Sequence, residues 1–420
     1  MYDKLLNILK RELIPALGCT EPIAIAYASA KAKEVLGDMP DKITVKCSGN
    51  IIKNVKGVIV PTTGDMKGIE TSAILGAVAG NASKVLEVLT DVKDEDIQKT
   101  KKLLEQGICS VDLEEDVDNL YINVIAKKED ESASVIIVDN HTNITKIEKN
   151  SEIIYEKDSV REKKAEEYSV DDVTVQAIYD FANTVKIEDV KETLDRQISY
   201  NTAIATEGLT HKYGANVGES LIRNYGNDIK ILAKAYAAAG SDARMSGCTM
   251  PVIINSGSGN QGITVSIPVI VYAKYLGVPD EKLYKALVLS NLIAIYQKKG
   301  IGKLSAYCGA VSAACGCAAG ISYLHDAPFE VITKTITNVL GNVSGIVCDG
   351  AKPSCAAKIA SSVDAAIMAH YMAMDGRTFS PGEGLIKGNV EETIKSICKM
   401  GKDGMKGTDV EILNIMIDKA

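Results

Sequence analysis

Residues 304–325 read LSAYCGAVSAACGCAAGISYLH and contain no Asp, Glu, Lys or Arg. The run is long enough to cross a bilayer, but it consists mostly of Ala, Gly, Ser and Cys, which are too weakly apolar for a convincing membrane segment. We therefore expect a buried helix. Long apolar-periodic stretches separated by Gly, Asn and Asp surround it, and they predict an all-α C-terminal part of the chain.

The N-terminal part shows a different pattern, because apolar residues alternate there as they do in half-buried strands. Ile43, Val45 and Cys47 alternate, and two further alternating runs, residues 120–124 and 133–137, flank an EDES turn and predict a β-hairpin. Residues 155–168 are rich in Lys and Glu, which is typical of a solvated linker or of the exposed start of a helix. The sequence thus predicts an α+β fold, with an N-terminal α/β domain holding a small sheet at residues 1–165 and an all-α domain at residues 166–420.

The composition of the chain argues against several classes of function. The chain has 420 residues, 46% of them apolar, which is enough for a sizeable core. Its net charge is 47 − 55 = −8, which argues against nucleic acid and anionic membranes as partners. Charged residues at short intervals in the first twelve positions interrupt any secretory signal. We expect a cytoplasmic protein with a small-molecule substrate, and self-association into a homo-oligomer stays open.

The ten cysteines are the most informative residues, because a reducing compartment does not use them as a disulfide framework. Cys308, Cys315, Cys317, Cys348 and Cys355 lie in segments dense with Gly, Ala and Ser. Thiolates in such segments can hold an iron–sulfur cluster whose sulfides accept hydrogen bonds from nearby backbone amides. The spacing matches neither a compact ferredoxin run nor a zinc CxxC pair, so the alternative that these cysteines are small core residues stays open.

A second motif is INSGSGNQGI, residues 254–263, which contains GxGxxG. The dinucleotide-binding interpretation is disfavoured, because the preceding apolar run is too short for a βαβ unit and the surroundings read as helical. We expect a turn whose backbone N–H groups bind a small carboxylate. The side chains beside them are those of Ser256, Ser258, Asn260 and Gln261. A simple tight loop between helices remains the alternative.

Cys19 lies at the start of a predicted helix that has Thr20 as its N-cap and ends at Gly37. The helix dipole would lower the pKa of this thiol, which suits a nucleophile, a proton acceptor or a metal ligand. Glu21 follows just inside the helix and can equally serve only to complement the dipole.

Four further polar residues are candidates, each with a plain structural alternative. His141 in DNHTNI follows a strand, where loops often carry function, although a lone His is more often structural. Lys303 could be a base if desolvated, but most Lys side chains are solvated. Arg244, in GSDARMSG with Asp242, suits a carboxylate ligand or a structural ion pair.

Seven segments of the chain together resemble a known family. They are GCTEPIAIA, NIIKNVKGV, DNHTNI, ARMSG, NSGSGNQGI, LSAYCGAVSAACG and GIVCDGAKPSCAAKIA. In this order they resemble the L-cysteine desulfidases and their relatives, which in turn look like the α-domain of iron–sulfur L-serine dehydratases. The resemblance implies a [4Fe-4S] cluster held by Cys308, Cys348 and Cys355, a catalytic Cys19, and no pyridoxal phosphate. Cys47, Cys109, Cys248, Cys315, Cys317 and Cys398 match no ligand motif and are expected in the core.

The activity that the resemblance implies is β-elimination of L-cysteine to sulfide, ammonia and pyruvate, since an iron not bound by cysteine is a soft Lewis acid suited to a thiolate leaving group. Cys19 is the first choice for the base or a displaceable fourth ligand, followed by Lys303 and Glu21. The turn residues, His141 and Arg244 are expected to bind the amino-acid substrate. Two alternatives stay open: a serine dehydratase-type lyase for serine or a related β-substituted amino acid, and a non-catalytic cluster-binding or electron-transfer protein.

Overall fold

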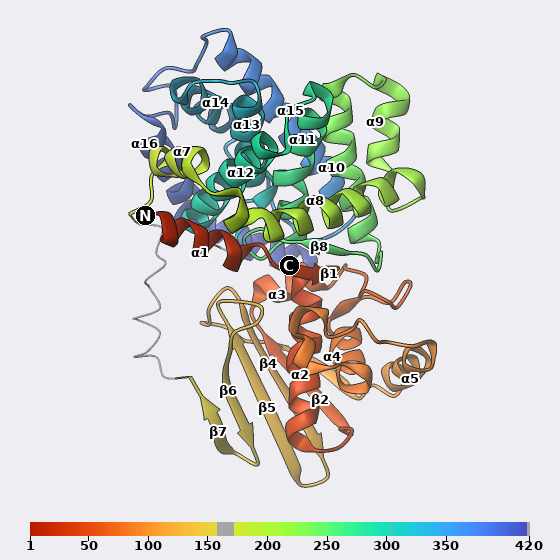
Figure 1. The fold of residues 1–420 in the computed structure, drawn as a ribbon. Helices are drawn as coiled ribbons and strands as arrows, with labels where there is room; N and C mark the ends of the chain where they lie inside the picture. The colour runs from red at the N-terminus through yellow and green to blue at the C-terminus, as the bar shows by residue number, and fades with distance from the viewer. Residues whose placement is uncertain (158–171, 303, 418–420) are drawn as a thin grey trace.

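The computed structural model describes residues 1–157, 172–302 and 304–417. The chain is α+β and builds a large helical body above a smaller part that contains a six-stranded sheet (Figure 1). The predicted domain boundary at residue 165 and the candidate Lys303 both lie outside the described residues.

The sheet has the strand order β3-β2-β4-β5-β6-β7, and all its neighbouring pairs are antiparallel except β2 with β3. The strands are β2 Lys42–Cys47, β3 Cys109–Leu113, β4 Tyr121–Lys128, β5 Glu131–Val138, β6 Ile144–Lys149 and β7 Glu152–Glu156. The predicted hairpin is β4 with β5, in register from Tyr121 opposite Val138 to Lys128 opposite Glu131. The alternation 120–124 and 133–137 therefore marked both strands correctly.

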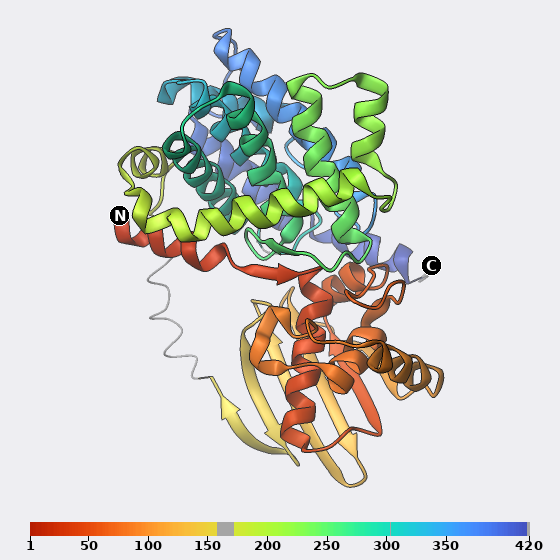
Figure 2. The same ribbon diagram turned by 45° about the vertical axis from the view of Figure 1, so that its right-hand side comes forward.

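Helices cover one face of this sheet (Figure 1, Figure 2). They are α2 Thr20–Leu36, α3 Gly49–Val55, α4 Gly68–Ala79, η1 Ala82–Glu87 and α5 Asp94–Glu105. α2 lies along β4 and β5, whose inward side chains are fully buried. A Cβ atom on Gly76 would lie 2.3 Å from the carbonyl oxygen of Ala26, so α4 packs backbone to backbone on α2. This close approach fixes α2, the helix that carries Cys19 at its start.

The helical body is built around α13 Gly309–Leu324, which contacts α11, α12, α14 and α15. Its other helices are α7 Val175–Thr184, α8 Ile187–Thr210, α9 Val217–Tyr225, α10 Ile229–Met245, α11 Gly259–Leu276, α12 Asp280–Ile301, α14 Phe329–Asn342, α15 Cys355–Met374, α16 Val390–Lys399, η3 Met400–Gly404 and α17 Lys406–Met416. The uncharged run forms this buried central helix, as predicted. Within the described residues, no helix is both long and apolar enough to span a bilayer.

One short strand corrects the prediction of an all-α C-terminal part. β8, Pro251–Ile253, pairs antiparallel with β1, Pro15–Leu17. Three residues are too few to show strand alternation in the sequence, which explains the miss. The preceding helix α1, Tyr2–Glu12, packs on α7, α8 and α12 of the helical body, and the chain then crosses to the sheet through β1 (Figure 2). The start of α2 is thereby held against the helical body.

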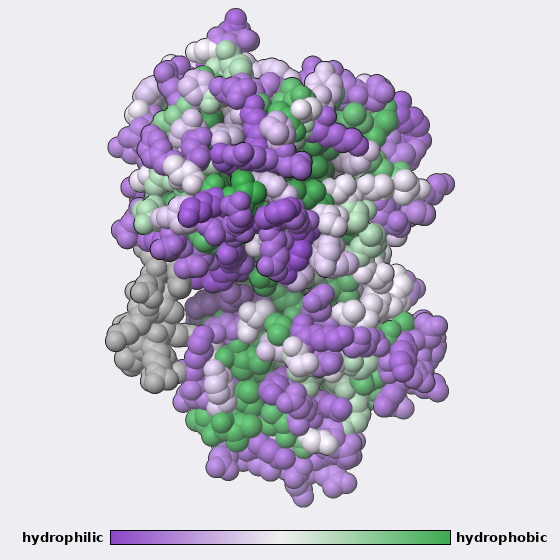
Figure 3. Space-filling view, viewed as in Figure 1, coloured by the Kyte–Doolittle hydropathy of each residue, from purple (hydrophilic) through white to green (hydrophobic). Residues whose placement is uncertain are grey.

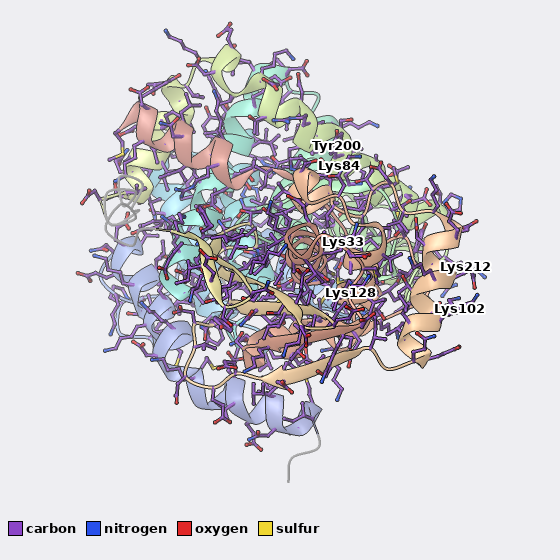
Figure 4. All side chains as sticks on the ribbon, turned by 90° about the horizontal axis from the view of Figure 1, so that it is seen from below. Lys33, Lys84, Lys102, Lys128, Tyr200 and Lys212 are labelled. Carbon is purple, nitrogen blue, oxygen red and sulfur yellow. The ribbon has the colours of Figure 1, made fainter. Side chains whose placement is uncertain are left out.

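The lysines labelled in Figure 4 come from separate elements of the chain. Two of them are neutralised, because Lys84 pairs with Asp91 and Lys128 with Asp38. The face shown in Figure 3 is mainly hydrophilic, with a hydrophobic area over the sheet. At the β7 edge, Ile153, Ile154 and Tyr155 are exposed.

Candidate active site

A cavity of about 90 Å³ is lined by residues from both the sheet part and the helical body. It brings together nine of the residues singled out in the sequence: Cys19, Glu21, Arg244, Ser258, Asn260, Gln261, Cys308, Cys348 and Cys355. Ser256 and His141 are not among its lining residues. The nine lining residues come from segments that are far apart in the chain, so only the fold brings them together.

Cys308 and Cys348 are placed by two crossing loops. Cys308 is the N-cap of α13, and its N–H donates to the carbonyl of Ile346 at 2.8 Å. The N–H of Cys348 donates to the carbonyl of Ala306 at 2.7 Å, and Tyr307 forms an antiparallel bridge with Val347 between them. This pairing sets the two thiols side by side, where the hydrogen bond from Cys308 lowers the pKa of Cys348.

The third thiol belongs to Cys355, the first residue of α15. It is buried beside Cys19 and Met245, and its Sγ lies 3.8 Å from the carbonyl oxygen of Gly350. Among the described residues, no three His, Cys, Asp or Glu side chains gather closely enough for a single metal ion. The ligands of a four-iron cluster need not meet at one point, because each cysteine binds a different iron and the cysteines need only surround one cavity.

The residues present fit such a cluster by their chemistry. Cys308, Cys348 and Cys355 line one cavity together with Cys19, and all ten cysteines are free thiols. Of the other six, Cys47, Cys248, Cys315, Cys317 and Cys398 are buried as expected for core residues, whereas Cys109 is only half-buried. None of these lines the cavity. Cys308, Cys348 and Cys355 are therefore the thiols of this chain suited to hold a cluster there.

Cys19 is the N-cap of α2, one residue before the predicted Thr20. The Thr20 hydroxyl donates instead to the carbonyl of Gly257 at 2.8 Å. Cys19 is 2% exposed, and burial raises the pKa of its thiol to about 12, although the charge of Arg244 opposes this. The expectation of a lowered pKa is wrong for this structure, because loss of water around the sulfur outweighs the helix dipole.

Glu21 is held ionised by its neighbours. Burial by itself would raise the pKa of this carboxyl, but His141 and Arg244 lower it overall. The Nε2 atom of His141 lies 3.8 Å from Oε1 of Glu21, and the amide of Asn54 donates to the same oxygen at 3.4 Å. His141 thus lies behind Glu21 and acts on the cavity through it.

The GxGxxG segment forms the turn between β8 and α11. A Cβ on Gly259 would lie 2.3 Å from Nε of Arg244, and one on Gly262 would lie 2.0 Å from the carbonyl oxygen of Ile253. These glycines therefore allow close packing of Arg244 and β8 against the start of α11. Gln261 in turn lies against Gly309, next to Cys308.

Two buried polar side chains in the cavity have one atom each without a hydrogen-bond partner among the described residues, Nε of Arg244 and Oε1 of Gln261. Arg244 also donates to Oδ1 of Asn260 at 3.1 Å. Asp242 does not pair with Arg244, because its carboxylate accepts the N–H of Val217 at the start of α9. Buried polar atoms are nearly always satisfied, so these two suit a polar ligand.

Lys298 is a cavity residue that the sequence reasoning missed. It lies on α12, is 3% exposed, and has no hydrogen bond or ion pair with any described residue. Burial lowers the pKa of its ammonium, opposed by the nearby Cys348 and Cys308. In the sequence Lys298 lies in the segment YQKKG, which is typical of a solvated helix end. The only available signal was its place on the apolar face of a long helix.

Comparison with known proteins agrees with the resemblance in part. A family model described as serine dehydratase alpha chain matches residues 83–414. The chain is 56% identical to a UPF0597 protein of Lachnoclostridium phytofermentans, with both chains covered in full. It is 52% identical to a UPF0597 protein of Desulfitobacterium hafniense, covering 100% of this chain and 97% of that one. A UPF0597 protein of Finegoldia magna is 50% identical over 98% of this chain and 99% of its own.

Proposed function

This chain belongs to the serine dehydratase alpha chain family, and from that premise we propose that it is a lyase that eliminates the β-substituent of a small α-amino acid, with L-cysteine as substrate. The observation that carries the proposal is the single cavity that joins three cysteines of separate loops to Cys19, Glu21 and Arg244. The family description alone supports a lyase of the serine dehydratase kind. The step to L-cysteine rests on the GCTEP segment around Cys19.

The proposed cofactor is a [4Fe-4S] cluster held by Cys308, Cys348 and Cys355. When bound, a cluster with one iron free of cysteine supplies a soft Lewis acid for a thiolate leaving group. The free state of all ten cysteines supports the proposal that the protein works in a reducing cytoplasm.

The charges of the cavity match an amino-acid zwitterion. We assign the substrate carboxylate to Arg244, whose Nε lacks a partner, and to the turn with Gln261. Glu21, ionised and buried, is suited to the substrate ammonium. Holding both ends fixes the Cα–H bond relative to the leaving group.

The α-proton is assigned to Cys19, with Glu21 as the second candidate. Burial keeps a proton on Sγ of Cys19 in this structure even with the charge of Arg244 nearby, so the proposal requires that this proton leaves before Cys19 accepts the α-proton. The cavity has a volume of about 90 Å³, and so small a space suits proton transfer to a fixed group.

The test is an anaerobic assay of the purified chain for iron, sulfide and pyruvate, with L-cysteine and L-serine in parallel. Iron-dependent release of sulfide from L-cysteine is the expected result. If pyruvate forms from L-serine and not from L-cysteine, the proposed substrate is wrong and the proposed lyase activity stands. Bound iron without turnover of either amino acid would overturn the lyase proposal in favour of a cluster-binding protein. Arg244→Gln should raise KM for either substrate, because it removes the cation assigned to the carboxylate.

A further inference from the structure

Four buried amide side chains hold the turn between β8 and α11. They are Gln197 and Asn201 of α8, Asn255 of the turn and Asn291 of α12, and each is 0% exposed. Asn201 fixes the two ends of the turn, because its amide donates to the carbonyls of Ile253 at 3.2 Å and Gly262 at 3.1 Å, and its Oδ1 accepts the N–H of Ile253 at 2.9 Å. The middle of the turn depends on the other three.

Asn291 is the centre of this group. Its Oδ1 accepts hydrogen bonds from the amides of Gln197 and Asn255, both at 3.0 Å. Its own amide donates to Oε1 of Gln197 at 2.8 Å and to the carbonyl of Leu287 at 2.9 Å. Every polar atom of the Asn291 side chain is therefore used, and buried networks satisfied in this way are rigid.

Asn255 connects this rigid network to the backbone of the turn. It exchanges backbone hydrogen bonds with Ser258 at 3.0 and 3.1 Å, and its Oδ1 accepts the hydroxyl of Ser256 at 2.9 Å. Ser256 has φ 51°, a conformation that costs free energy in a residue with a Cβ and persists where neighbouring contacts impose it. On the other side, Thr20 binds the carbonyl of Gly257, which links the turn to the residue after Cys19.

We propose that Asn291 is a positioning residue for the active site. Through Asn255 it sets the conformation of the turn, and so the places of Ser258, Asn260 and Gln261 in the cavity. Asn291 itself does not line the cavity. Its effect on turnover rests on the proposed lyase function, whereas its effect on the turn does not.

The test is Asn291→Leu, which keeps the size of the side chain and removes its hydrogen bonds. We expect faster amide hydrogen exchange in residues 251–262 and a fall in kcat/KM for L-cysteine of about 10- to 100-fold per iron-loaded folded chain, chiefly through KM, because misplaced binding groups weaken productive binding. A companion variant, Gln197→Leu, leaves the bond from Asn255 to Asn291 in place and should give a smaller change in the same direction. It keeps the test valid if Asn291→Leu does not fold.

The matched control is Asn338→Leu on α14. Asn338 is also 0% exposed and also holds a loop, since its amide donates to the carbonyl of Arg377 at 3.0 Å and its Oδ1 accepts the N–H of Phe379 at 3.1 Å. This variant should melt at a lower temperature than the wild type, yet keep the wild-type KM and the wild-type rate of amide hydrogen exchange in residues 251–262. If Asn291→Leu behaves in the same way as this control, Asn291 is merely structural and the proposal is overturned.

The two proposals fail differently. If the wild-type chain turns over neither L-cysteine nor L-serine, the lyase function fails, and the exchange of residues 251–262 alone decides on Asn291. Faster exchange in Asn291→Leu and not in Asn338→Leu then supports the assignment, and equal exchange rejects it.

Discussion

Cys308 and Cys348 are held side by side by their backbones, because the N–H of Cys308 donates to the carbonyl of Ile346 and the N–H of Cys348 donates to the carbonyl of Ala306. The backbone bonds between the two loops place both cysteines at the cavity, and Cys355 at the start of α15 lines it from a third segment. These three positions are the proposed ligands of the cluster.

This arrangement predicts that Cys308→Ala, Cys348→Ala and Cys355→Ala each lose iron and activity together, because two cysteines hold a cluster poorly. Cys317→Ala is the control in the same helix as Cys308; its thiol is fully buried away from the cavity. It should keep its iron at some cost in stability. Iron and sulfide analysis of anaerobic preparations checks this. Iron loss from the Cys317 variant with retention in the Cys348 variant would refute the ligand assignment.

For Cys19→Ser we expect most of the iron to remain, since three ligands are unchanged, and turnover to fall by about 10²–10⁴-fold, the usual contribution of a positioned proton-transfer group. A hydroxyl in the same surroundings is a much weaker acid than a thiol, so serine is a poorer proton-transfer group than Cys19. Iron per chain, melting temperature and sulfide release are measured on one preparation. A variant that melts earlier but turns over at the parental rate would remove Cys19 from the mechanism and leave it a core residue.

Much of the fold could be predicted from local patterns. The alternation in β4 and β5 and the uncharged α13 were readable because each pattern is long and has one period. β8 could not be read from three residues, since its pairing with β1 is a contact between distant segments. The GxGxxG glycines were expected outside a βαβ unit, and they follow the three-residue strand β8, but their close packing on Arg244 and Ile253 depends on tertiary structure.

The candidate site was predictable where a motif carried it and not where burial decided it. The thiol of Cys19 has a raised pKa because the helical body covers it, which no local pattern reveals. Lys298 was overlooked for the converse reason: the KKG end of a helix normally faces water, yet here the fold closes over it. Asn54 likewise reaches Glu21 only because α3 packs beside α2.

Lys298 leads to a prediction about stability. Lys298 is a buried ammonium without a partner among the described residues, which is costly, so Lys298→Met should raise the free energy of unfolding of the iron-free chain by about 1–4 kcal/mol, while activity of the iron-loaded chain falls. Urea denaturation measures the first and sulfide release the second.

The control is Lys53→Met. Lys53 is buried to the same degree, at 2% exposure, but is paired with Asp409. Removing it leaves Asp409 without its cation and should lower the free energy of unfolding. A loss of stability in both variants would mean that Lys298 has a compensating partner in the iron-free protein.

His370 predicts how stability depends on pH. This imidazole is fully buried on α15 against His325, with ring centroids 4.7 Å apart, and its Nδ1 lies 2.8 Å from the hydroxyl of Ser322. Burial, with a smaller effect of His325, lowers the pKa of His370 to about 3. Since the unfolded value is about 6.5, the folded state favours the neutral ring, and its contribution is present above about pH 6.5 and lost as pH falls toward 3.

Between about pH 7 and about pH 4.5 this single group should cost the protein about 2.5 kcal/mol of unfolding free energy, because the unfolded state takes up the proton and the folded state does not. His370→Gln, which can keep a hydrogen bond to Ser322, should reduce the difference between the two pH values by that amount. His211→Gln, at a side chain that is 64% exposed, should leave it unchanged. Urea denaturation of the three chains at both pH values provides the comparison, and an equal pH dependence in wild type and His370→Gln would show that His370 is protonated in the folded state as readily as in the unfolded one.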